Sequence, residues 1–317
     1  MSTVYVIADQ YAETISDHTQ SVIEAARAFS LPIVVLVAGK VSATALAPLQ
    51  AISVVKTIVH YVDPILDDKL PEWLAPVYAE RIARAPGWVL MAANTYGKSV
   101  LPRLAAMLDL EMVSNVREIT FPHVAHDLYA GNIIERIELG SSPVCMSIQA
   151  SAFSGVSLDY SNHSAVEVVA ELPATMPDYQ AVVTALSACD HDKPRLDNAA
   201  CVIGGGRALG STANFQRLQV LADRMGAAMG GTRAAVDAGY ITNHYQIGQT
   251  GQVIAPDTYM AFGISGAIQH VAGITASRTI VAVNTDPDAE IFQVADYGLV
   301  GDWSEVVTAL ERHVRKG

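Results

Sequence analysis

The sequence has few of the residues that hold metals or form disulfides. Its three cysteines, Cys145, Cys189 and Cys201, stand far apart and form no Cys-x-x-Cys pair. They therefore indicate reduced thiols in or beside a core, and neither a metal site nor a redox motif. His123 and His126 lie three residues apart in a strand-like segment, which places them on opposite faces of a strand. We therefore expect no bound metal.

Basic residues are also scarce. The 20 lysines and arginines against 32 aspartates and glutamates give a formal net charge of -12. Because nucleic-acid binding depends on clustered basic side chains, we expect no nucleic-acid partner. The first apolar run, residues 4–8, has no basic region before it and is too short for a signal or membrane segment. These features predict a cytoplasmic protein with no membrane span.

Apolar material is abundant. Hydrophobic residues make up 51% and charged residues 16% of 317 positions, which is enough for two buried cores. In the first half, short β-branched runs alternate with helical patterns. The expected strands are residues 4–8, 33–37, 54–59 and 88–92, and the expected helices are residues 18–29 and 98–108. This alternation predicts a parallel sheet covered by helices, an N-terminal α/β domain of the nucleotide-binding-like type.

After residue 116 the pattern changes to strand-like segments separated by turns. Residues 133–139 and 144–148 have strand character, and Ala130-Gly131-Asn132 predicts a tight turn. We expect these strands to extend the same sheet in antiparallel fashion at its edge.

A polar stretch around Pro194 divides the chain. It predicts a linker over residues 191–198, between an N-terminal domain of residues 1–190 and a C-terminal domain of residues 199–317. The second domain has expected strands at residues 200–203, 259–262 and 279–283, and expected helices at residues 214–225, from about 266, and 304–314. This order predicts a smaller, doubly wound α/β unit.

A glycine-rich loop joins the first of these strands to its helix: Gly204-Gly205-Gly206-Arg207-Ala208-Leu209-Gly210. Backbone N–H groups and the helix dipole at such a junction suit a pyrophosphate, and Arg207 adds a positive charge. Leu209 breaks the Gly-x-Gly-x-x-Gly spacing, so a nicotinamide fingerprint is not supported and a simple tight turn is the alternative.

Other polar residues have ordinary explanations when each is taken by itself. Arg233 suits a solvated surface charge, His270 a helix histidine satisfied by a neighbour, and Asp302 a cap for the last helix. The loop of residues 246–251 is rich in glycine and side-chain donors and lacks strand or helix periodicity. That composition favours a loop that hydrogen-bonds a polar ligand.

Several motifs follow one another in the last third of the chain: GGGR at 204–207, TRAAVDAGY at 232–240, QIGQTG at 246–251, GISGAIQH at 263–270 and IFQVADYGLVGD at 291–302. This order resembles the alpha subunit of the electron-transfer flavoproteins. The first domain matches in fragments such as ANTYGK at 93–98 and LPRLAA at 101–106. The resemblance implies an electron carrier whose C-terminal, doubly wound domain binds FAD noncovalently.

The resemblance also implies roles for single residues. In that family the residue matching Arg233 lies over the flavin ring, the one matching Thr250 reaches flavin N5, and the one matching His270 lies near the O2 carbonyl. There a donor or positive charge stabilises negative charge on the reduced ring, so these three residues tune the flavin and none is a nucleophile or general base. Asn284 and Asp302 match positions at the adenosine end of FAD. The other cofactor-binding positions carried over are Arg207, Thr232, Gln246, Gln249, Gly263, Ser265, Gly266, Ala267, Ile268 and Gln269.

Three positions depart from the family pattern. Thr232 stands where the family usually has serine, and Thr285 and Glu290 stand where many members have lysine and proline. Thr232 keeps the hydroxyl group of serine, whereas Thr285 and Glu290 make the local surface more acidic. The flavin potential and the choice of redox partner are therefore less transferable than cofactor binding.

The resemblance finally implies partners. A beta subunit completes the flavin pocket and holds AMP, or a second FAD in electron-bifurcating complexes, while a donor dehydrogenase and an acceptor oxidoreductase supply and take electrons. Two other hypotheses stay open from the residues. One is a nucleotide-binding regulatory module with the same fold. The other is a stand-alone flavin or nicotinamide oxidoreductase, against which stands the lack of an acid–base pair in the sequence.

Overall fold

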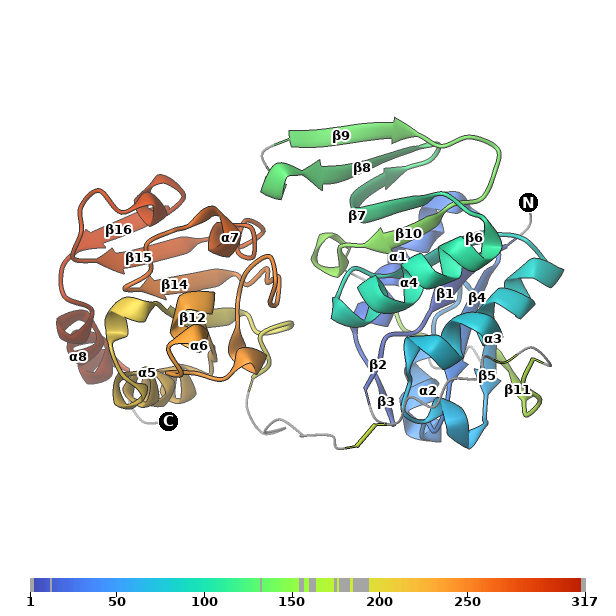
Figure 1. Cartoon of the computed structure of the whole chain (residues 1–317), viewed down its shortest axis with the longest axis horizontal. Helices are drawn as coiled ribbons and strands as arrows, with labels where there is room; N and C mark the ends of the chain where they lie inside the picture. The colour runs from blue at the N-terminus through green and yellow to red at the C-terminus, as the bar shows by residue number, and fades with distance from the viewer. Residues whose placement is uncertain are drawn as a thin grey trace. The chain divides into compact units, whose positions relative to one another are not determined.

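The chain forms two compact units, each built on its own sheet (Figure 1). A computed structural model describes residues 3–11, 13–131, 133–153, 157–159, 164–173, 176, 183–184 and 194–314. The first unit consists of residues 1–128 and 133–186, and the second of residues 129–132 and 187–317.

The first unit contains a nine-stranded sheet with the order β11-β5-β4-β1-β6-β10-β7-β8-β9. Neighbouring strands from β11 to β7 are parallel, and β8 and β9 continue the sheet in antiparallel fashion. The strands are β1 (Val4–Ile7), β4 (Ile33–Ala38), β5 (Val55–Tyr61), β6 (Trp88–Ala92), β7 (Met112–Thr120), β8 (His123–Leu128), β9 (Ile133–Glu138), β10 (Cys145–Ile148) and β11 (Ala165–Val169). A short pair, β2 (Gln10–Tyr11) and β3 (Thr14–Ile15), lies apart from this sheet.

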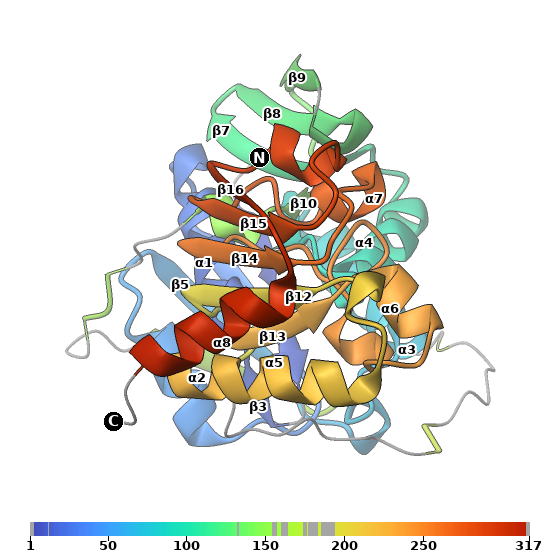
Figure 2. The ribbon, with the colours of Figure 1, turned by 90° about the vertical axis from the view of Figure 1, so that its left-hand side faces the viewer.

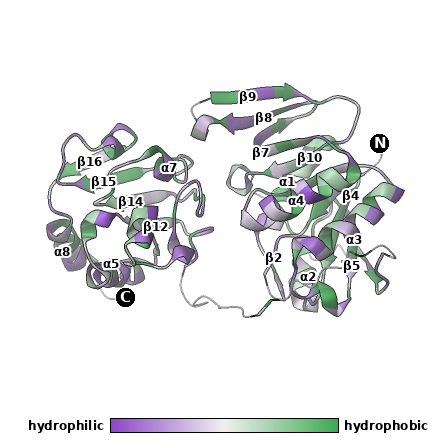
Figure 3. Cartoon of the chain, viewed as in Figure 1, coloured by the Kyte–Doolittle hydropathy of each residue, from purple (hydrophilic) through white to green (hydrophobic). Residues whose placement is uncertain are grey.

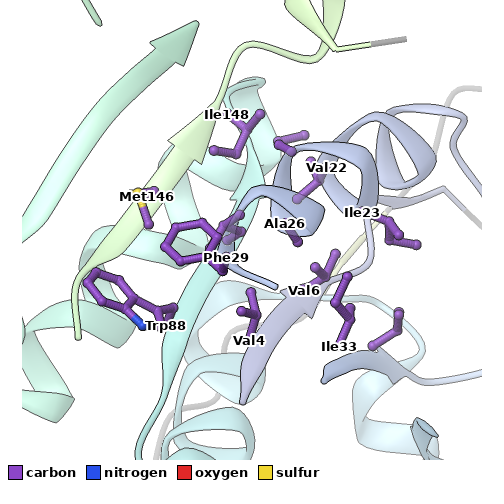
Figure 4. Close-up of a cluster of buried hydrophobic side chains, with 14 of the residues drawn as sticks. Val4, Val6, Val22, Ile23, Ala26, Phe29, Ile33, Trp88, Met146 and Ile148 are labelled. Atoms are coloured by element: carbon purple, nitrogen blue, oxygen red, sulfur yellow. The ribbon is translucent and has the colours of Figure 1, made fainter. Parts of the chain in front are cut away.

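Helices pack on both faces of this sheet, because alternate residues of its central strands are buried on opposite sides. Val4 and Val6 of β1 belong to one core cluster with Phe29, whereas Tyr5 and Ile7 belong to the other. Figure 4 shows Phe29 packed beside Trp88, with ring centroids 5.1 Å apart. The helices are α1 (His18–Ala26), α2 (Ala43–Gln50), α3 (Pro71–Arg84) and α4 (Thr95–Leu108), with 3-10 turns η1 (Arg27–Phe29), η2 (Pro64–Leu66), η3 (Tyr129–Gly131) and η4 (Ala150–Ala152).

The expected parallel α/β arrangement of this unit is confirmed, with two differences in detail. Strand β10 was expected at the antiparallel edge, but it pairs in parallel with β6 and β7 inside the sheet. All four of its residues are buried, as suits an interior strand. The expected tight turn at residues 130–132 corresponds to η3 up to Gly131, and Asn132 lies outside the described residues.

The second unit is a five-stranded, fully parallel sheet with the order β13-β12-β14-β15-β16. Because the chain leaves β12 first toward β13 and then returns to β14 on the other side, the expected doubly wound topology is confirmed. The elements are β12 (Cys201–Gly205), β13 (Ala228–Gly231), β14 (Thr258–Phe262), β15 (Ile280–Asn284), β16 (Tyr297–Val300), α5 (Thr212–Met225), α6 (Arg233–Asp237), α7 (Ile268–Val271), α8 (Trp303–His313), η5 (Arg207–Leu209), η6 (Asn243–Tyr245) and η7 (Glu290–Gln293).

Helices α5 and α8 lie side by side across one face of this sheet (Figure 2). Arg217 joins them through an ion pair with Glu311 at 3.1 Å. In Figure 3 strand β15 is mostly hydrophobic, whereas helices α5 and α8 contain both hydrophobic and hydrophilic residues. Leu196, within the expected linker, is buried in the core on the sheet's other face.

Residues first considered for metals have structural partners. His126 lies 2.8 Å from Glu135 through Nε2 and 3.1 Å from the Ser114 carbonyl through Nδ1. Cys145 and Cys201 are free thiols, and Cys189 lies outside the described residues. Within the part of the chain that the structure describes, no group of three or more metal-ligating side chains gathers. No helix there is long and apolar enough to cross a bilayer.

Candidate cofactor site

A cavity of about 670 Å³ lies at the carboxyl ends of four parallel strands in the second unit. Loops after β12, β13, β14 and β15 and the polar loop near residue 248 form its walls. The volume falls within the usual range of small-molecule sites, about 300–1,000 Å³. Its position beside the point where strand order reverses, between β12 and β14, is where open α/β sheets bind ligands. The lining residues are Gly206, Arg207, Ala208, Thr232, Arg233, Ala234, Asp237, Gln246, Ile247, Gly248, Thr250, Gly263, Ile264, Ser265, Ala267, Gln269, His270, Asn284, Asp286 and Ala289.

Glycines let the two central loops approach each other at this point. A Cβ atom on Gly206 would lie 1.9 Å from the carbonyl oxygen of Gly263, so no other residue fits there without a backbone shift. Gly263 itself has φ +61°, a conformation that favours glycine. The approach places Arg207, the first residue of η5, on the cavity wall.

Charged side chains of both signs surround the cavity. Arg233 begins α6 with a side chain 68% exposed, and its Nε lies 3.5 Å from Oδ2 of Asp237, one helical turn later. Asp286 also lines the cavity, so two arginines and two aspartates contribute to its wall. The sequence reasoning missed both aspartates as lining residues, although the four-residue spacing of Arg233 and Asp237 was a signal. Thr232 caps α6, because its hydroxyl accepts a hydrogen bond from the Ala235 amide at 3.3 Å.

The polar loop presents one hydroxyl to the cavity. Nε2 of buried Gln246 donates to Oγ1 of exposed Thr250 at 2.9 Å, which leaves the threonine's own proton free to be donated to a ligand. Gly248, with φ +142°, packs against the Gln269 backbone and shapes the loop. The amide of Gln249 donates to the Gln269 carbonyl at 2.8 Å, and this residue lies outside the lining.

His270 enters the cavity wall from α7 and is 6% exposed. Its Nδ1 lies 3.1 Å from the Ile247 carbonyl and its Nε2 lies 2.8 Å from the Tyr259 hydroxyl. Burial lowers the pKa of His270 to about 4, although the Ile247 carbonyl opposes this shift. The imidazole is therefore neutral at pH 7.

The loop after β14 contributes Ser265, Ala267 and Gln269 to the lining, all with exposed side chains. Its helix is shorter than expected: α7 begins at Ile268 rather than near residue 266. Gly266 has φ +92°, and a Cβ there would lie 2.2 Å from the Ile291 amide, so this residue serves backbone packing outside the lining. Ile268 is 54% exposed and also lies outside the lining.

The two residues expected at an adenosine end differ in position. Asn284 lines the cavity, and its side chain donates to the Ile264 carbonyl at 2.9 Å and accepts from the Asp286 amide at 3.0 Å. Asp302 lies outside the lining and caps α8 by accepting from the Ser304 amide at 2.7 Å. Hydrogen bonds from Ser304 lower the pKa of the Asp302 carboxyl. The structure therefore contains the helix-capping contact that was the alternative interpretation of Asp302.

Comparison with known proteins identifies the family. A family profile described as electron transfer flavoprotein FAD-binding domain matches residues 195–275, and one described as electron transfer flavoprotein domain matches residues 4–190. The electron transfer flavoprotein subunit alpha of Pseudomonas aeruginosa is 39% identical, over 98% of this chain and 99% of its own length. The chain belongs to the electron transfer flavoprotein alpha-subunit family.

Eukaryotic members of the electron transfer flavoprotein alpha-subunit family show similar agreement. The Arabidopsis thaliana protein of that name, described as mitochondrial, is 39% identical over 96% of this chain and 87% of its own length. A probable mitochondrial counterpart from Saccharomyces cerevisiae is 38% identical over 99% of this chain and 93% of its own length. The resemblance and the electron-transfer function expected from the sequence are confirmed at the family level.

FAD is the cofactor of the electron transfer flavoprotein FAD-binding domain, and the cavity suits it. Because Gly206 has no side chain, the backbone at the end of β12 can come close to a bound ligand. The neighbouring Arg207 offers a positive charge for a pyrophosphate. Arg233 offers a planar cation, and Thr250 a donor, for an aromatic ring system. The cofactor expected from the sequence is confirmed.

Proposed function

We propose that this chain is the FAD-holding subunit of a heterodimeric electron carrier with no substrate of its own. The observation that carries the proposal is the polar cavity at the reversal point of the second sheet, lined by Arg207, Arg233, Thr250 and His270. When bound, FAD supplies the electron-transfer chemistry that side chains lack. The chain's residues bind the cofactor, orient it and adjust the free-energy difference between its oxidised and reduced forms.

The proposed division of roles follows the position of each side chain. Arg207 and the backbone amides after β12 would hold the pyrophosphate, Arg233 would cover the flavin ring, and the Thr250 hydroxyl would donate a hydrogen bond to that ring. Asn284 stabilises the loop after β15 at the adenosine end, because the nitrogen and the oxygen of its side-chain amide each form a hydrogen bond with a backbone group. The other binding positions proposed, including those outside the lining, are Thr232, Gln246, Gln249, Gly263, Ser265, Gly266, Ala267, Ile268, Gln269 and Asp302.

The proposed partner is an electron transfer flavoprotein beta subunit, because the relatives are named alpha subunits and a subunit implies a complex. That beta subunit holds AMP, or a second FAD in a bifurcating complex. A dehydrogenase donates the electrons and an oxidoreductase accepts them. The proposed location is the cytoplasm, a reducing compartment consistent with the free thiols of Cys145 and Cys201. The proposed domains are residues 1–190 and 199–317.

The test is an absorption spectrum of the chain co-purified with the product of a neighbouring beta-subunit gene, followed by stepwise reduction and flavin counting. One FAD per heterodimer, reduced by a dehydrogenase and reoxidised by an acceptor, supports the simple carrier. Two FAD molecules per heterodimer indicate bifurcation. A colourless complex that takes up no added FAD contradicts the proposal and favours the hypothesis of a regulatory nucleotide-binding module.

A further inference from the structure

His270 and Tyr259 form a buried pair behind the cavity wall. The phenol is fully buried and the imidazole is 6% exposed. Nε2 lies 2.8 Å from the phenol oxygen, and Nδ1 lies 3.1 Å from the carbonyl oxygen of Ile247. Both ring nitrogens thus have protein partners in the ligand-free chain.

The chemistry of these partners determines where the protons lie. A backbone carbonyl can accept but not donate, so Nδ1 must carry the ring proton. Burial raises the pKa of the Tyr259 phenol and lowers that of His270, so both groups are neutral at pH 7. The second nitrogen, Nε2, therefore has a bare lone pair, and the phenol donates its proton to it.

The imidazole reaches from the cavity wall into the core. Ile247 and Tyr259 belong to the same buried core cluster, but Ile247 also lines the cavity and Tyr259 lies outside the lining. The Nδ1–H group is thus on the cavity side and Nε2 on the core side. Because linked hydrogen bonds polarise one another, donation from the phenol to Nε2 makes Nδ1–H a stronger donor.

The glycine-rich loop makes this arrangement possible. Tyr259 pairs with Val202 in the parallel register of β12 and β14, and Gly204 lies two residues further on the same face. A Cβ atom on Gly204 would lie 2.0 Å from the phenol oxygen. Any other residue there would displace the hydroxyl from His270, which gives Gly204 a role separate from phosphate binding.

We propose that Tyr259 is a positioning residue for His270: its hydroxyl holds the imidazole as the Nδ1–H form and strengthens that N–H as a donor at the cavity wall. His270, held neutral, would then stabilise negative charge on reduced FAD by sharing its one N–H between the Ile247 carbonyl and the cofactor, and not as a cation. This inference rests on the proposed function, since FAD is the ligand. It adds Tyr259 and Gly204 to the residues that tune the cofactor.

The first test compares the wild-type chain and Tyr259→Phe, each assembled with its beta subunit, by titrating oxidised and reduced FAD. Losing the hydrogen bond from Tyr259 to His270 should lower the ratio of the affinity for reduced FAD to that for oxidised FAD about three- to tenfold. Tenfold corresponds to about 30 mV in a two-electron couple. Gly204→Ala should shift the ratio in the same direction. The matched control is Tyr240→Phe, which removes a phenol of the same unit that packs on Phe215 outside the lining.

A double-mutant cycle separates positioning from a general structural effect. In a His270→Asn background, Tyr259→Phe should leave the affinity ratio unchanged, because the residue through which it acts is absent. An equal effect in both backgrounds would overturn the proposal.

NMR of the ligand-free chain with ¹⁵N-labelled histidine tests the proton positions without any flavin. The proposal requires a protonated Nδ1, an unprotonated Nε2, and no titration of His270 between about pH 5.5 and 8. Tyr259→Phe should move both ring resonances of His270, while Tyr240→Phe should move neither. A proton on Nε2, or resonances unaffected by Tyr259→Phe, contradicts the inference. If the wild-type complex binds no FAD, the proposed function fails while this measurement still decides the histidine geometry.

Discussion

At the scale of single residues, Arg233 is a planar cation whose guanidinium stands open to the cavity and to solvent, with Asp237 beside it. A guanidinium stacked on a ring stabilises added negative charge there, typically by about 0.5–2 kcal/mol. Arg233→Ala should therefore lower the reduction potential of bound FAD and reduce the affinity ratio of reduced over oxidised FAD about two- to thirtyfold. Potentiometric titration measures this. Arg278→Ala, which removes an exposed arginine outside the lining, should leave the potential unchanged, and equal shifts would contradict the stacking role.

The buried imidazole of His270 also links stability to pH. Its pKa is about 4 in the folded chain and about 6.5 when unfolded, so the unfolded state binds more protons between these values. Stability is complete above about pH 6.5 and falls as the pH drops toward 4, by about 3 kcal/mol at most. Urea unfolding of the ligand-free chain between pH 4.5 and 7.5 measures the slope. His270→Gln should flatten it, and an unchanged slope in that variant would place the effect in other groups.

At the scale of elements, the five-residue helix α6 depends on its first cap. The hydroxyl of Thr232 accepts from the Ala235 amide, and Thr232 is 9% exposed. Thr232→Ala should cost about 1 kcal/mol of unfolding free energy, whereas Thr232→Ser keeps the capping oxygen and should cost much less. Chemical denaturation of the ligand-free variants compares them. If serine proves as destabilising as alanine, the methyl group and not the cap stabilises this turn.

The sequence predicted most strands because β-branched runs bounded by turn residues have few other solutions. It did not predict α2 and α3, whose periodic patterns are interrupted by Pro48 and Pro76 inside the helices. The place of β10 was also beyond sequence reasoning. A short, fully buried strand fits any interior position, and its neighbours cannot be deduced from its four residues alone.

Much of the candidate site could be predicted because the carboxyl ends of parallel strands meet at one edge of a sheet. Gly206 and Gly263 directly follow strands, Asn284 ends one, and all three line the cavity there. The structure was needed for Tyr259, which reads as an ordinary core residue in sequence. Its role depends on strand register and on the missing side chain at Gly204.

At the scale of the whole molecule, each unit has its own sheet and its own buried cores. FAD at 100 times its dissociation constant should therefore stabilise the second unit by about 2.7 kcal/mol and leave the first nearly unchanged. Fluorotryptophan NMR during denaturation can follow both, since Trp73 and Trp88 report on the first unit and Trp303 on the second. A shift of all three signals together on adding FAD would contradict independent unfolding.

The insertion of β10 between β6 and β7 has a consequence for how the protein is made. On the ribosome, residues 112–138 emerge before residues 145–148, yet β7 joins the sheet by pairing with β10. Until β10 has been synthesised and has docked on β6, the β7–β9 meander has no partner on the β10 side of β7, and that edge stays exposed. Such late closure by a non-local strand slows folding and gives chaperones a defined segment to protect.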